Sequence, residues 1–204
     1  MSMNQKRIRL MSRVAIVLAA SLCMLFLLAT EARAQSVNYK RIYMSYAKQL
    51  QKKSSSRLYM AIVKSDQPVL LIAERVFRSS YYGNGNCAAD AKIYQYVKNR
   101  KKVVYVGPVS SAGTGFPLRK SGKYIQRAYH HEACRIRVKN GKATGQEISN
   151  VFMPDNGKAE IRKVTVKNGK WRFKYLKKVT QAKGGKIYAK YYSGKNQAIK
   201  FKGV

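Results

Sequence analysis

The pentapeptide VKNGK, which occurs at residues 138–142 and again at residues 166–170, decides how this chain is expected to fold. Asn140-Gly141 and Asn168-Gly169 suit a type I′ turn, because both central residues of that turn take positive φ and Asn and Gly accept it best. Apolar and basic residues alternate at 134–138, before the first copy, and at 171–175, after the second. The repeat therefore predicts two β-hairpins.

The period of two extends along the chain. Residues 134–138, 171–175 and 199–202 each place apolar or aromatic side chains at every second position with Arg or Lys between them, as half-buried strands do. Residues 69–73 are continuously apolar and predict a central strand covered on both faces. We expect a mainly β fold, an antiparallel meander of hairpins that forms a sandwich, a curved sheet or a propeller-like arrangement.

One amphipathic helix is expected before the strands, because apolar residues recur there with helical spacing. It ends in the polar run 51–56, which reads as a linker. We expect the helix to dock on a basic β-rich domain at 57–204, so that residues 35–56 hold the helix and linker. The residues of its apolar stripe are Tyr39, Ile42, Tyr43, Tyr46, Ala47 and Leu50.

Residues 1–34 have the organisation of a secretory signal peptide. A basic segment at 1–13 precedes an apolar run at 14–30, and Ala32 and Ala34 stand where signal peptidase requires small residues. Cleavage would make Gln35 the first residue. The alternative is an uncleaved signal anchor, since the apolar run is barely long enough to span a bilayer. Both alternatives predict a secreted or extracytoplasmic domain.

Two cysteines, Cys87 and Cys134, follow the leader. In an oxidising compartment a lone pair of cysteines is often bridged, so a Cys87–Cys134 disulfide is expected. The alternative is two separate buried thiols.

The chain carries a formal net charge of +34, most of it after residue 34 and interleaved with aromatic residues, which indicates a folded cationic domain. Such a charge attracts polyanions. The expected partners are an anionic cell-wall polymer, an acidic glycan or an anionic membrane surface, and export disfavours nucleic acid as the natural partner. The alternative is a surface that serves solubility alone. If strands turn their apolar residues inward, the candidate polyanion-binding residues are Arg135, Arg137, Arg172, Lys174, Lys200 and Lys202.

Catalytic constellations are weak. A cysteine peptidase could use Cys87 with His130 or His131, although no known nucleophile motif surrounds Cys87. A glycosidase could pair Glu74 with Asp90 or Glu132. The run 130–134, HHEAC, could hold a metal, but a structural turn is the simpler interpretation, because adjacent histidines on a strand point to opposite faces. No cofactor or metal is expected.

Several segments resemble a group of uncharacterised exported proteins of Gram-positive (Firmicutes-type) bacteria. They are Tyr59, residues 68–73, 92–96 and 104–107, and the VKNGK hairpin. The resemblance implies export and a β-rich fold and no known activity. We therefore expect a non-enzymatic module that binds anionic polymers or a membrane surface; the alternatives are a small secreted hydrolase and a structural or adhesion module.

Overall fold

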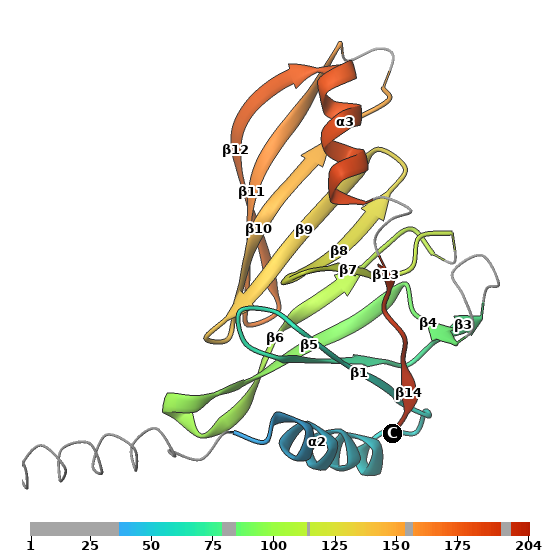
Figure 1. Ribbon diagram of the computed structural model, residues 1–204, viewed down its shortest axis with the longest axis vertical. Coiled ribbons are helices and arrows are strands. Elements are labelled where there is room, and N and C mark those ends of the chain that lie inside the picture. Colours follow the sequence, from blue (N-terminus) through green and yellow to red (C-terminus); the bar gives the residue numbers. More distant parts are fainter. Residues whose placement is uncertain (1–36, 79–84, 114, 154–156, 193–196) are drawn as a thin grey trace, which may run out of the picture. The chain divides into compact units, whose positions relative to one another are not determined.

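The computed structural model describes residues 37–78, 85–113, 115–153, 157–192 and 197–204 (Figure 1). From Tyr39 to Val204 they belong to one unit. Within these ranges no helix has the length and apolarity needed to cross a bilayer. The predicted signal peptide, or signal anchor, at residues 1–34 lies outside the described part of the chain.

A five-stranded antiparallel sheet lies in the lower part of Figure 1, with β2 at its centre. All five residues of β2 are buried. Val69 and Leu71 pack toward the second sheet, whereas Leu70 and Ile72 pack toward the N-terminal helix. The prediction of a central strand covered on both faces is confirmed. The strands, in spatial order, are β14 (Lys202–Gly203), β1 (Tyr59–Val63), β2 (Val69–Ala73), β5 (Asp90–Val97) and β6 (Lys102–Ser110).

The expected amphipathic helix is α2 (Tyr39–Lys53), which continues into the segment predicted as a linker. It packs on the outer face of the five-stranded sheet, as expected. The hydroxyl of Tyr43 donates a hydrogen bond to the Pro68 carbonyl (2.6 Å) and accepts one from the Tyr96 N–H (2.9 Å). Burial raises the pKa of Tyr43 to about 12, so this hydroxyl stays a donor at every physiological pH.

A seven-stranded antiparallel sheet contains both VKNGK hairpins, β9–β10 and β11–β12. The turn residues have φ of 51° and 73° at Asn140 and Gly141, and of 50° and 81° at Asn168 and Gly169. Both predicted hairpins are confirmed, with positive φ where it was expected. The strands, in spatial order, are β12 (Lys170–Thr180), β11 (Lys158–Lys167), β10 (Lys142–Ser149), β9 (Glu132–Lys139), β8 (Tyr124–Tyr129), β7 (Arg119–Ser121) and β13 (Gln197–Ala198).

One hydrophobic cluster joins the inner faces of the two sheets. Two buried polar side chains also tie the end of β9 to the five-stranded sheet. Ser65 Oγ accepts from the Val138 N–H (2.7 Å), and the Gln95 amide donates to the Val138 carbonyl (3.3 Å) and accepts from the Gly141 N–H (2.7 Å). Because β8 pairs with β9 only as far as Ile136, these bonds satisfy backbone groups of Val138 and of the following turn that β8 does not reach.

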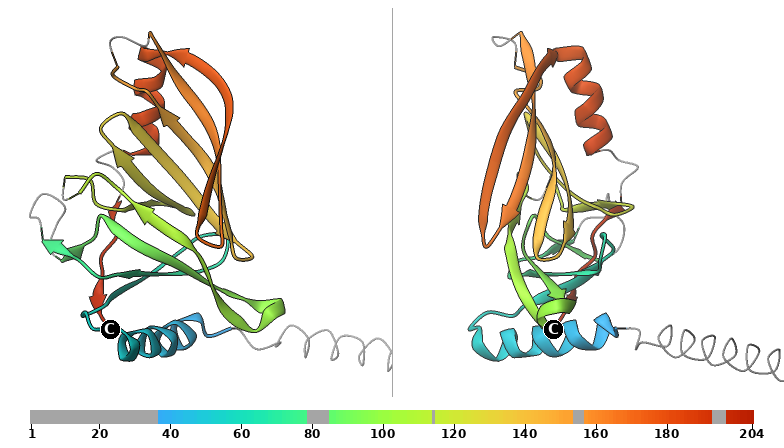
Figure 2. Two further views of the ribbon diagram at one scale, coloured as in Figure 1. Left: turned by 180° about the vertical axis from the view of Figure 1, so that it is seen from behind. Right: turned by 90° about the vertical axis from the view of Figure 1, so that its left-hand side faces the viewer.

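A second helix, α3 (Gln181–Tyr191), lies on the opposite face of the seven-stranded sheet (Figure 2). The sequence did not predict it; the mainly β, antiparallel fold class is confirmed, but the described residues contain two α-helices where one was expected. Thr180 caps α3 by accepting a hydrogen bond from the Lys183 N–H. Gly184 allows the helix to approach the sheet, since a Cβ there would lie 2.6 Å from Ala159 Cβ. Short elements complete the fold: β3 (Phe77–Arg78), β4 (Asn86–Cys87) and the 3₁₀ turn Lys98–Arg100.

The C-terminal segment belongs to both sheets. After α3 the chain adds β13 to the edge of the seven-stranded sheet and then β14 to the edge of the five-stranded sheet. Between these strands Ile199 and Phe201 are buried in the shared core. The sequence predicts their alternation with Lys200 and Lys202 correctly, although the segment is not one continuous strand.

Candidate anion-binding face

The register of four neighbouring strands aligns basic side chains in rows. Arg135 of β9 lies opposite Gln146 of β10, Gln146 lies opposite Lys163 of β11, and Lys163 lies opposite Lys174 of β12. Cross-strand partners point to the same face of a sheet. These four residues therefore form one row on the face that also carries α3.

The next rows continue the pattern. Arg137, Thr144, Thr165 and Arg172 are successive cross-strand partners. One step further, toward the two VKNGK turns, Lys139 lies opposite Lys142 and Lys167 lies opposite Lys170. Because side chains alternate along each strand, all of these residues share the face of Arg135. We call the basic residues of these rows the cationic face: Arg135, Arg137, Lys139, Lys142, Lys163, Lys167, Lys170, Arg172 and Lys174.

Three pairs of lysines on the cationic face are direct cross-strand neighbours: Lys139 with Lys142, Lys163 with Lys174, and Lys167 with Lys170. All six side chains are exposed. Like charges placed directly opposite each other destabilise a sheet. The fold therefore retains an arrangement that works against its own stability.

Arg135 has a fixed position on this face. Its guanidinium carbon lies 4.9 Å from the ring centroid of Tyr124 and 4.4 Å from that of Tyr191, on α3. The Tyr191 hydroxyl donates to Gln146 Oε1 (2.8 Å), so the helix is tied to the first row. Stacking between rings lowers the conformational entropy that the arginine loses when it binds an anion.

Two cavities of about 320 and 310 Å³ adjoin Arg135, and Tyr124, Arg135 and Arg137 line both. Lys190 of α3 adds a cation to the first, and Lys163 adds one to the second. Each cavity therefore has several positively charged side chains on its walls, beside a tyrosine ring.

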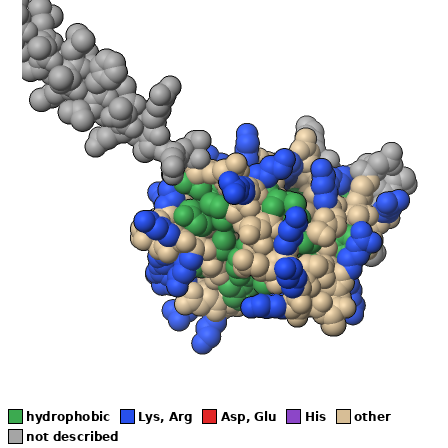
Figure 3. Space-filling view, turned by 90° about the horizontal axis from the view of Figure 1, so that it is seen from below, with side chains coloured by type: hydrophobic (Ala, Val, Ile, Leu, Met, Phe, Trp, Pro, Cys, Tyr) green, Lys and Arg blue, Asp and Glu red, His purple; other side chains and the backbone are tan. Residues whose placement is uncertain are grey.

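Asp66 is a carboxylate at the margin of the cationic face. Its oxygens lie 3.7 Å from Arg137 Nε and 3.7 Å from Lys123 Nζ, so it offsets part of their charge. The cationic face is not the whole of the basic surface, because Lys and Arg side chains also surround the hydrophobic groups on the α2 side in Figure 3. What distinguishes the cationic face is its ordered rows and the two cavities.

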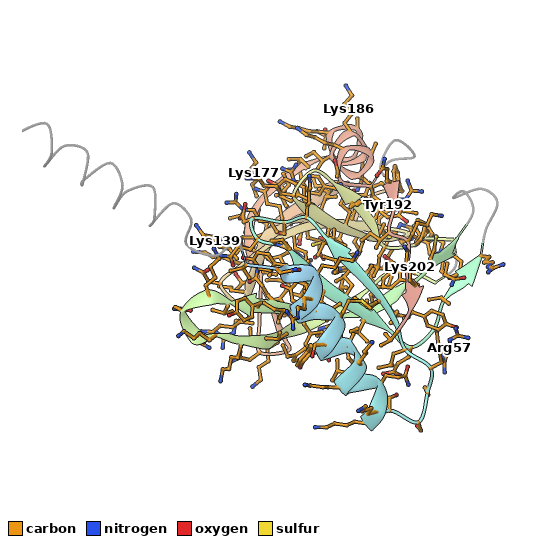
Figure 4. The ribbon with its side chains drawn as sticks, turned by 60° about the horizontal axis from the view of Figure 1, so that its bottom comes forward. Arg57, Lys139, Lys177, Lys186, Tyr192 and Lys202 are labelled. Atoms are coloured by element: carbon orange, nitrogen blue, oxygen red, sulfur yellow. The ribbon has the colours of Figure 1, made fainter. Side chains whose placement is uncertain are left out.

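Four of the six predicted polyanion-binding residues, Arg135, Arg137, Arg172 and Lys174, come together on the cationic face. The other two lie elsewhere. Lys202 belongs to β14 of the five-stranded sheet, and Figure 4 shows it well separated from Lys139. Lys200 precedes it and its Nζ lies 3.5 Å from Cys87 Sγ. The sequence also missed Lys163, whose place between Arg135 and Lys174 depends on strand register.

The aromatic residues of β12 do not turn fully inward as expected. Phe173 and Tyr175 are 47% and 54% exposed, because β12 is the edge strand of its sheet. The assumption that all aromatics of the alternating strands are buried is therefore wrong for this strand.

Cys87 and Cys134 are both free, and each is buried. The structure thus has the separate buried thiols rather than the expected disulfide. Burial raises the pKa of Cys134 to about 12, against the opposing effect of Arg127. A thiol in that state is a poor nucleophile.

Of the residues of the catalytic alternatives, Glu74 and Asp90 line one cavity of about 310 Å³, and the two histidines lie in structural contacts. His130 and His131 form the β8–β9 turn, where His130 packs edge-to-face on Phe116 and His131 Nδ1 lies 2.9 Å from the Val151 carbonyl. Glu74 accepts a hydrogen bond from Lys92 Nζ (2.8 Å), which lowers the pKa of its carboxyl. Over the described ranges no three His, Cys, Asp or Glu side chains gather as a metal site would require.

Comparisons with known proteins find no relative: no family model matches the chain, and neither a curated protein nor a solved structure matches it.

Proposed function

We propose that the protein is an exported, non-enzymatic module that binds an anionic polymer of the cell surface, or an anionic membrane surface, through the cationic face. Export is inferred from the predicted leader. The partner class is inferred from the charge of +34 and from the rows of Arg and Lys.

The observation that carries this proposal is the set of three opposed lysine pairs. Each pair lowers the stability of the sheet, and a neutral residue at either position would remove the repulsion. Surfaces that serve solubility do not need like charges in register. A repeating anion placed over the face would offset both members of each pair, so the arrangement is favourable only in the bound state.

Binding would be driven mainly by the release of counterions from the polymer, and its affinity would fall steeply as salt rises. The two cavities beside Tyr124 would each accept one anionic group. The guanidinium of Arg135, held between Tyr124 and Tyr191, would contribute paired donors to a phosphate or carboxylate.

The test compares two variants of equal net charge. In the first, Arg137, Lys163, Arg172 and Lys174 are replaced by Gln. In the control, Lys40, Lys48, Lys52 and Lys53, all exposed on α2, are replaced by Gln. We expect the first variant to elute from heparin, and from isolated cell wall, at clearly lower salt than the control.

Equal elution of the two variants would reject the cationic face and leave only non-specific attraction. Capture of a protein partner that does not depend on salt would favour the adhesion alternative instead. N-terminal sequencing of the mature protein tests export separately, with Gln35 as the expected first residue.

A further inference from the structure

A strip of aromatic side chains lies on the edge strand β12, on the face of the seven-stranded sheet that does not carry α3. Trp171, Phe173 and Tyr175 stand at every second position and pair with Val166, Val164 and Arg162 of β11. The Trp171 and Phe173 rings are stacked, with centroids 5.9 Å apart and planes 22° apart. Because Phe173 and Tyr175 are half exposed, the strip presents ring surface to solvent.

Charged side chains on the neighbouring strands form the floor of a hollow beside this aromatic strip. Arg127, Glu147 and Arg162 occupy one row of the sheet, ending at Tyr175. Arg127 Nη2 lies 2.6 Å from Glu147 Oε2, and Arg162 Nη2 lies 2.8 Å from Glu160 Oε2. Each guanidinium therefore has a carboxylate partner, and the charges of the floor nearly offset one another.

Arg127 is held in place by its surroundings. Its guanidinium carbon lies 4.8 Å from the Trp171 ring and 5.1 Å from the Tyr129 ring, and its Nη2 is also 3.9 Å from Glu132 Oε2. Arg127 is therefore a fixed member of the cavity floor.

A cavity of about 490 Å³ lies over these groups. It falls in the size range of small-molecule sites, which combine apolar walls with a few placed polar groups. Its walls are aromatic on the β12 side and polar on the floor. The residues that line it and enter the argument are Arg127, Tyr129, Glu132, Arg162, Trp171 and Phe173.

The chemistry of this cavity differs from that of the cationic face. Glu132, Glu147 and Glu160 gather here in a chain that has only eight acidic residues in all. They offset the charges of Arg127 and Arg162, so the cavity offers a polyanion little net attraction. Paired carboxylates and guanidiniums accept and donate hydrogen bonds, as hydroxyl groups require, while aromatic rings pack against the apolar C–H face of a sugar ring.

We propose that the aromatic strip and the cavity bind an uncharged saccharide chain. The rings of Trp171, Phe173 and Tyr175 form the platform along which sugar rings stack, and Glu132 and Arg162 bind their hydroxyl groups at the cavity. This site is independent of the cationic face, because the two lie on opposite faces of the same sheet.

The experiment uses Trp171, the single tryptophan of the chain, as the reporter. The probes are neutral hexasaccharides of β-1,4-linked glucose and of β-1,4-linked N-acetylglucosamine, titrated at low and at high salt. We expect a saturable change in tryptophan fluorescence with one of them, of equal midpoint at both salt concentrations.

Two variants decide the assignment. Phe173→Ala should weaken binding by about 5- to 10-fold, the loss of one stacked ring. Leu176→Ala is the control, since Leu176 is 44% exposed but lines a cavity of the cationic face. It should bind as the unmodified protein does.

The proposal is overturned if neither hexasaccharide changes the fluorescence, if the midpoint shifts with salt, or if Phe173→Ala binds as tightly as Leu176→Ala. The four-residue cationic-face variant should keep full saccharide binding. Failure of the saccharide site and failure of polyanion binding are therefore observed separately.

Discussion

Replacing Lys163 by Gln should make the protein more stable and, at the same time, a weaker polyanion binder. Lys163 is exposed and lies directly opposite Lys174. Removing one charge relieves a repulsion that we take as about 0.5 kcal/mol, the size of a typical favourable cross-strand pair. For a domain of this size that corresponds to a rise in melting temperature of about 1–2 °C.

The same substitution removes one cation from the first row of the cationic face. With a single-stranded DNA oligomer as a polyanion of known charge spacing, the slope of log K against log salt should become shallower by about 0.7. The assays are thermal unfolding followed by circular dichroism and fluorescence anisotropy across a salt series. Lys48→Gln, on the exposed side of α2, is the control and should leave the melting temperature within error.

A variant that melts lower than the unmodified protein would refute the repulsion argument, because a neutral side chain would then be worse than the opposed lysine pair. An unchanged salt slope together with a higher melting temperature would show that the repulsion exists but serves no contact with the polymer.

Three further predictions concern the interior. Burial raises the pKa of the Glu147 carboxyl from 4.5 to about 7, so the folded state favours its neutral form. The free energy of unfolding should therefore fall, by on the order of 2–3 kcal/mol, as pH rises from about 4.5 to 7. In urea titrations Glu147→Gln should remove this dependence on pH. Gly184→Ala should lower the free energy of unfolding by about 1–3 kcal/mol, since its Cβ would lie 2.6 Å from Ala159 Cβ. Cys87 and Cys134 should react with iodoacetamide only after denaturation and without prior reduction, measured by mass spectrometry.

Each of these has an outcome that contradicts it. If the free energy of unfolding instead rises between pH 4.5 and 7, the attraction of Arg127 outweighs burial in setting the pKa of Glu147. Gly185→Ala, whose Cβ would meet only the Phe152 ring edge at 3.3 Å, is the control for Gly184 and should be much milder. Cysteines that react only after reduction would restore the disulfide interpretation.

Local features of the fold could be predicted because they depend on neighbouring residues. Asn-Gly pairs between alternating strands favour a type I′ turn, which requires positive φ at both central residues, and the apolar run at 69–73 suits a strand buried on both faces. Helix α3 was missed because Gly184 and Gly185 lower helix propensity. Its stability comes from packing that the two glycines allow, which no local pattern reveals.

The candidate sites depend on register, which alternation alone does not give. The alternation of side chains along a strand correctly predicts that Arg135 and Arg137 share a face, and that Arg172 and Lys174 do. It does not predict that β10 and β11 lie between these pairs and add Lys163. The cluster of Arg127, Glu147 and Arg162 is assembled from three strands, so its members are far apart in the sequence.

The placement of the last two strands has a consequence for synthesis. The Val204 N–H bonds to the Leu58 carbonyl, and β13 and β14 close one edge of each sheet. A polypeptide that emerges from the ribosome with its N-terminus first cannot finish either sheet until residues 197–204 have been synthesised. Nascent molecules would therefore stay open and accessible to chaperones while all the preceding strands are made, and removal of residues 197–204 would damage both sheets at once.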